Sequence, residues 1–101
     1  MRISKEEHSA IIKTAIKCFG KGISVILFGS RVDDNEKGGD IDLLIINEKY
    51  TDKTELFNQK IEFLTYLKEV IGERKIDVLT KYKDDTRDIV NTAINTGLKL
   101  C

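Results

Sequence analysis

The chain has 101 residues, of which 41% are hydrophobic and 34% are charged, a composition typical of a small globular protein. Lysine and arginine together number 17, as do aspartate and glutamate, so the formal net charge is zero. That balance argues against a protein dedicated to binding nucleic acid, which carries an excess of basic residues. We expect a single domain over residues 1–101.

Two cysteines, Cys18 and Cys101, have a spacing that fits neither a metal site nor a disulfide framework. A reducing, cytoplasmic location fits this cysteine usage. Residues 1–10 are polar and mixed in charge, unlike a signal peptide. The longest apolar run, residues 43–46, is too short to span a membrane, so we expect no membrane partner.

The first predicted helix covers residues 4–19. Ser4 and Glu7 have the spacing of a capping box, and apolar residues then recur at helical intervals until Gly20 ends the pattern. The β-branched run over residues 23–28 predicts the first strand.

Residues 31–39 are polar and end in glycine, as in a loop or one short helical turn. Residues 40–46 predict a second strand with apolar residues on both faces, as in a strand that is covered on both sides. Asp52 and Glu55 then open a second helix that ends at Gly72. Its expected apolar stripe consists of Phe57, Ile61, Leu64, Leu67 and Ile71.

Residues 75–80 predict the third strand. Either Asp84 or Asp85 is expected to cap a third helix, which ends at Gly97. Residues 98–100 form either a short final strand or a packed tail. The side chains of the third helix that we expect to face inward are Ile89, Ala93 and Ile94.

This order of elements, α-β-β-α-β-α, predicts an α/β (α+β) fold with a small mixed sheet flanked by helices. The helix between residues 40–46 and residues 75–80 is expected to be a crossover, which would make those two strands parallel neighbours.

Two aspartates begin the second predicted strand. Asp40 and Asp42 are separated by one residue, so their carboxylates project from the same face. Two like charges placed together need compensation, and a divalent cation supplies it. The simpler interpretation is that Asp40 ends a glycine turn and Asp42 is an acid at a strand edge.

Asp77 lies in the middle of the third predicted strand, among apolar residues. A carboxylate in a buried strand costs stability unless it is paired or binds a metal. One interpretation is a salt bridge to Arg74 or Lys75. The other is that Asp77 faces Asp40 and Asp42 on the neighbouring strand, in a site that binds two cations.

Gly29 and Ser30 directly follow the first predicted strand. Glycine permits a sharp turn and close approach of a ligand, and the serine hydroxyl and the backbone N–H groups suit phosphate oxygens. The guanidinium of Arg31 would suit a triphosphate, unless it pairs with Asp33 or Asp34. A phosphate-holding turn beside metal carboxylates indicates phosphoryl or nucleotidyl transfer.

Gly29-Ser30 followed by Asp40-x-Asp42 and a later strand aspartate, Asp77, resembles the DNA polymerase β-like nucleotidyltransferase superfamily. The short chain is similar to its minimal nucleotidyltransferase (MNT) branch. The resemblance implies catalytic and metal-binding roles for Asp40, Asp42 and Asp77, with two Mg²⁺ ions and ATP as the nucleotide donor. It also implies nucleotide binding by Gly29, Ser30 and Arg31. Two loop positions depart from the family pattern, at Asp34 and Gly39.

Many MNT proteins are encoded beside a HEPN-domain toxin, and the resemblance implies that this chain is the antitoxin. It would transfer AMP to a tyrosine hydroxyl of the toxin, and it would belong to a homo- or hetero-oligomer. A second hypothesis is a non-catalytic antitoxin that neutralises the toxin by forming a complex. A third is the catalytic subunit of a transferase that modifies a small molecule.

Overall fold

The computed structural model describes residues 3–28, 41–47, 52–72, 75–81 and 85–101. The predicted order of elements is confirmed, and the segment after the last helix forms a fourth short strand. The elements are α1 (Lys5–Phe19), β1 (Ile23–Phe28), β2 (Ile41–Asn47), α2 (Lys53–Ile71), β3 (Ile76–Lys81), α3 (Asp88–Thr96) and β4 (Leu98–Lys99).

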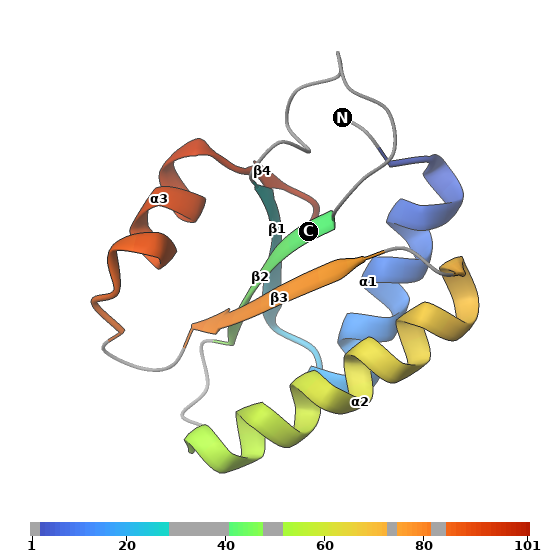
Figure 1. Cartoon of the computed structure of the whole chain (residues 1–101), viewed down its shortest axis with the longest axis horizontal. Helices are drawn as coiled ribbons and strands as arrows, with labels where there is room; N and C mark the ends of the chain where they lie inside the picture. The colour runs from blue at the N-terminus through green and yellow to red at the C-terminus, as the bar shows by residue number, and fades with distance from the viewer. Residues whose placement is uncertain (1–2, 29–40, 48–51, 73–74, 82–84) are drawn as a thin grey trace.

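The strands form one mixed sheet in the order β3-β2-β1-β4. β1 pairs antiparallel with both β2 and β4. β2 and β3 are parallel, as expected for strands joined through a crossover helix. Figure 1 shows α1 and α2 on one face of the sheet and α3 on the other, so the molecule has three layers.

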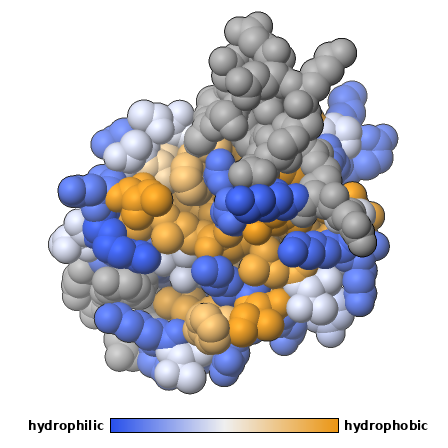
Figure 2. All heavy atoms as spheres, viewed as in Figure 1, coloured by the Kyte–Doolittle hydropathy of each residue, from blue (hydrophilic) through white to orange (hydrophobic). Residues whose placement is uncertain are grey.

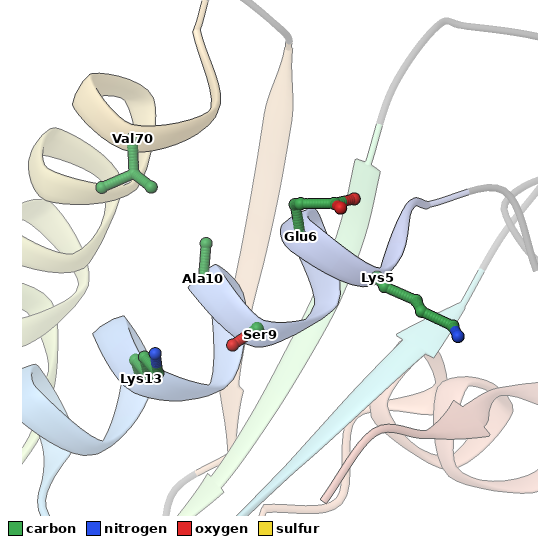
Figure 3. A pocket seen from close by; sticks show the side chains of 6 residues that line it. All are labelled: Lys5, Glu6, Ser9, Ala10, Lys13 and Val70. Carbon is green, nitrogen blue, oxygen red and sulfur yellow. The ribbon is translucent and has the colours of Figure 1, made fainter.

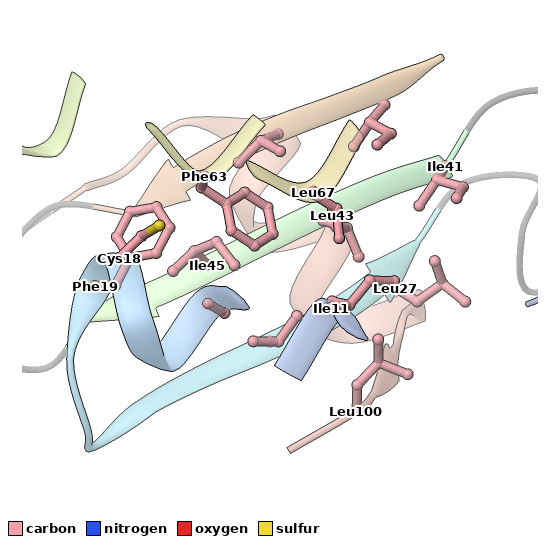
Figure 4. Close-up of a cluster of buried hydrophobic side chains, with 14 of the residues drawn as sticks. Ile11, Cys18, Phe19, Leu27, Ile41, Leu43, Ile45, Phe63, Leu67 and Leu100 are labelled. Atoms are coloured by element: carbon pink, nitrogen blue, oxygen red, sulfur yellow. The ribbon is translucent and has the colours of Figure 1, made fainter. Parts of the chain in front are cut away.

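A hydrophobic core lies on each face of the sheet. The larger core joins α1 and α2 to the sheet through Ile11, Leu43 and Phe63, which are completely buried (Figure 4). The smaller core packs Val90 and Ala93 of α3 against the other face. β2 contributes side chains to both cores, which confirms that it is covered on both faces.

α1 begins with the predicted capping box. The Ser4 hydroxyl accepts a hydrogen bond from the Glu7 N–H at 3.0 Å, and the Glu7 carboxylate accepts one from the Ser4 N–H at 2.9 Å. Farther along the helix, the His8 ring donates to the Leu100 carbonyl at 3.2 Å and so ties α1 to the C-terminal segment. No helix in the described part of the chain has a stretch long and apolar enough to cross a lipid bilayer.

The buried face of α2 differs from the predicted stripe. Leu67 is buried as expected, and Leu64 and Ile71 are partly buried against the same core. Phe57 and Ile61, however, are 57% and 48% exposed. Leu56 and Phe63 occupy the core instead. Successive helix positions lie about 100° apart, so both sets have helical spacing and only the position of the sheet selects one of them.

α3 also differs from the prediction at two points. Its N-cap is Arg87, without a side-chain capping bond, so the expected cap at Asp85 is wrong, and Asp84 lies outside the described residues. Ala93 faces inward as predicted, but the other inward side chain is Val90. The two isoleucines expected there are instead largely exposed, at 53% for Ile89 and 40% for Ile94. The helix starts later than expected and meets the sheet along a narrow stripe.

Candidate functional site

Two of the three predicted catalytic aspartates lie side by side. Asp42 on β2 and Asp77 on β3 are direct partners in the parallel register. Residues directly opposite each other project from the same face, and neighbouring strands lie about 4.8 Å apart. Both residues are the second residues of their strands. The register thus places Asp77 beside Asp42, and the remainder of the prediction, which includes Asp40, lies outside the described residues.

Asp77 is exposed, and none of the described residues forms an ion pair or a hydrogen bond with its side chain. The alternative of a salt bridge to Lys75 is not seen, and Arg74 lies outside the described residues. Asp42 is half-buried beside it. Two carboxylates at adjacent positions repel each other, so this pair favours a bound cation.

The other predicted site residues lie outside the described part of the chain. These residues are Gly29, Ser30, Arg31 and Asp40. Their sequence neighbours are placed, because Phe28 ends β1 and Ile41 begins β2. Phe28 and Asp42 are partners in the antiparallel register, so the described residues Phe28 and Ile41 adjoin the Asp42–Asp77 pair. The roles of these four residues remain predictions.

Comparison with protein families identifies one match, to the nucleotidyltransferase domain, over residues 9–99. The matched region includes Asp42, Asp77 and almost all of the described secondary structure. The chain belongs to the nucleotidyltransferase domain family. No curated protein matches the chain. Transfer of a nucleotidyl group is the general activity of this family.

Nucleotidyltransferase domains act on nucleoside triphosphates and use divalent metals, and the Asp42–Asp77 pair has the chemistry to hold such a metal. Carboxylate oxygens are the ligands that Mg²⁺ prefers, usually one or two carboxylates together with water and substrate phosphates. The residues that the structure describes contain no cluster of three or more acidic, histidine or cysteine side chains able to hold an ion. Asp40, the third predicted ligand, is not among those residues.

Phe28 is a site neighbour that the sequence analysis did not assign. It is half-buried, and its register partner is Asp42. Phe28, Asp42 and Asp77 therefore form one row across β1, β2 and β3 on the face that α3 partly covers. The signal in the sequence was the position of Phe28 directly before Gly29 and Ser30.

The opposite end of β3 is held by an ion pair that sequence reasoning also missed. Arg87 donates from its Nε and Nη2 atoms to both carboxylate oxygens of Asp85, at 2.6 to 3.1 Å. The same Nη2 donates to the Thr80 carbonyl at 2.7 Å. The Asp85 side chain is fully buried, so this contact anchors the start of α3 to the end of β3.

The surface hollows of the described residues do not coincide with the aspartate row. One hollow of about 460 Å³ is lined by five residues of α1 and by Val70 of α2 (Figure 3). Another, of about 180 Å³, lies beside Phe57, Thr80 and Arg87, at the far end of β3. The residues that line these two hollows do not include Asp42 or Asp77.

Proposed function

We propose that this nucleotidyltransferase is a Mg²⁺-dependent adenylyltransferase that transfers AMP from ATP to a tyrosine hydroxyl of a HEPN-domain toxin and thereby acts as its antitoxin. The observation that supports catalysis is the register pairing of Asp42 with Asp77, two carboxylates on one face within a nucleotidyltransferase domain. Asp77 has no structural partner among the described residues, so it is available for chemistry. The partner and the tyrosine rest on the resemblance to the MNT branch.

Asp42 and Asp77, together with Asp40, would hold two Mg²⁺ ions, whose chemistry is to offset charge on the triphosphate. The acceptor hydroxyl oxygen forms a bond to the α-phosphorus of ATP, and the bond between the α-phosphorus and the bridging oxygen breaks. Pyrophosphate leaves, and the hydroxyl proton passes to the carboxylate of Asp77, which acts as general base. Gly29, Ser30 and Arg31 would hold the phosphates.

The test is co-expression with a HEPN-domain protein from the same gene neighbourhood, followed by intact mass spectrometry of that partner. We expect mass increments of whole AMP units with the wild type. The increments should disappear with Asp42→Asn, because a metal ligand is lost, and should remain with Glu55→Gln, an exposed acid on α2.

Two results would contradict the proposal. A partner that stays unmodified but copurifies supports neutralisation by complex formation. If the Asp42→Asn variant modifies the partner as fully as the wild type does, the aspartate pair has no role in the mechanism.

A further inference from the structure

The outer edge of β3 runs directly past Asp77. β3 is the last strand on its side of the described sheet, so one of its edges has no neighbouring strand among the described residues. The Ile41 N–H donates to the Lys75 carbonyl, and backbone groups alternate between the two edges of a strand. The N–H and carbonyl groups of Ile76, Val78 and Thr80 therefore point away from β2, on the open side.

Among the described residues, a side chain covers this open edge at one end only. Arg87 donates to the Thr80 carbonyl at 2.7 Å and covers the end that lies far from the site. None of the described residues bonds to the outward backbone groups of Ile76 or Val78. Proteins usually shield free strand edges because these attract other strands. Here the segment that no described residue covers is centred on Asp77.

The surroundings of this segment also suit a polypeptide. In Figure 1 β3 lies in front of the other strands, and Figure 2, in the same view, shows apolar surface gathered on this face. Phe57 and Ile61, one helical turn apart on α2, have exposed side chains, and Phe57 lines a hollow with Thr80 at the end of β3 that lies far from Asp77. By contrast, the strand at the other end of the sheet, β4, has two residues and offers little backbone for pairing.

We propose that an extended segment of the acceptor protein adds to the sheet as a strand along Ile76–Val78 and so presents its hydroxyl to Asp77. This inference rests on the proposed transfer reaction and specifies how the acceptor is held. In an antiparallel arrangement the acceptor exchanges backbone hydrogen bonds with Ile76 and with Val78. Asp77 and the acceptor residue opposite it then form a non-hydrogen-bonded pair, with their Cα atoms about 4.5 Å apart.

The side chain of that acceptor residue projects from the face that carries Asp42 and Asp77. A serine hydroxyl would reach only the neighbouring carboxylate. A tyrosine is long enough to extend over Asp77 toward Asp42, where both carboxylates face it. The edge geometry is therefore compatible with the tyrosine acceptor of the proposed function.

The first test uses binding alone. The probe is the synthetic peptide acetyl-Thr-Val-Tyr-Val-Thr-amide at millimolar concentration, added to the full chain carrying Asp77→Asn, which blocks transfer. We expect exchange of the Ile76 and Val78 amide protons to slow by about tenfold, the scale of one added hydrogen bond. The Leu79 amide, which faces β2, should not change. Unchanged exchange at Ile76 and Val78 would overturn the proposal.

The second test uses transfer of AMP from ATP to the same peptide, read by mass spectrometry. Val78→Pro removes an outward N–H without removing a hydrogen bond to β2, whereas Val78→Ala reduces the same side chain and keeps the N–H. We expect the rate of AMP transfer by Val78→Pro to be at least about tenfold lower than that by Val78→Ala, because one backbone hydrogen bond to the acceptor is lost.

Equal transfer by the two variants would overturn the edge proposal and leave the proposed function intact. Protection without any transfer by the wild type would contradict the proposed function alone. Protection that rises with protein concentration in the absence of peptide would assign the edge to a second copy of the chain and overturn the proposal.

Discussion

At the scale of single residues, Asp77 is an exposed carboxylate within a strand whose neighbours on both sides are buried. Its position could be predicted from the sequence, because aspartate is a poor strand former and needs a reason to stand there. Its pairing with Asp42 was confirmed by the strand register. The positions of Gly29, Ser30, Arg31 and Asp40 depend on a long connection whose path residue spacing does not determine.

Cys18 provides a prediction about pH. Burial raises the pKa of the Cys18 thiol above its ordinary value of 9.0, and the charge of Glu62 raises it further. Because the thiolate is the charged form, the unfolded chain releases this proton more readily than the folded one. The Cys18 contribution to stability should therefore be unaffected below pH 9.0 and decline above it.

The measurement for Cys18 is the rate of alkylation by iodoacetamide at fixed pH in a Cys101→Ser background. We expect Glu62→Gln to lower the pKa of Cys18 and so to speed the reaction, while Glu69→Gln leaves the rate unchanged. No acceleration with Glu62→Gln would show that the carboxylate does not act on the thiol.

Gly97 provides a prediction about packing. A Cβ atom at this position would lie 2.5 Å from the Ala93 carbonyl oxygen and 2.9 Å from that of Leu27, and it would also clash with the Ile26 side chain. We expect Gly97→Ala to lower the free energy of unfolding by about 1–3 kcal/mol through overpacking. Urea unfolding would measure the change, with the exposed Asn95→Ala as the control, and equal stabilities would contradict this close contact.

At the scale of elements, the boundaries of α1 and α2 were more predictable than the buried faces of the helices. Capping residues and terminal glycines act locally, so Ser4 and Gly72 were identified correctly. Which face of α2 is buried depends on where the sheet lies. Phe57 and Phe63 both fit a helical period, and the sequence contains no local signal that separates them.

The corrected face of α2 predicts opposite results for two similar substitutions. Phe63→Ala should lower the free energy of unfolding by about 3–5 kcal/mol, because Phe63 is completely buried. Phe57→Ala should change it by about 0.5 kcal/mol or less, because that ring is largely exposed. Chemical denaturation of both variants would measure the difference. The reverse order would contradict the packing of α2.

At the scale of the whole molecule, the fold was predictable because several independent patterns agreed. Apolar residues on both faces of β2 indicated a covered central strand, and the following helix indicated a parallel crossover. The contact of Arg87 with Asp85 and Thr80 was not predictable, because it depends on how the start of α3 lies against the end of β3. The open edge beside Asp77 appears only once the strand order is known.

The most direct test of the account is calorimetric titration of the chain with a non-cleavable ATP analogue in the presence of Mg²⁺. The account predicts that Asp42→Asn combined with Asp77→Asn weakens binding at least about tenfold, because metal-bridged contacts to phosphate contribute several kcal/mol. The control Glu55→Gln, an exposed acid at the opposite end of the sheet, should bind like the wild type. Equal affinity in the double variant and the wild type would contradict the assignment of the Asp42–Asp77 pair as the nucleotide and metal site.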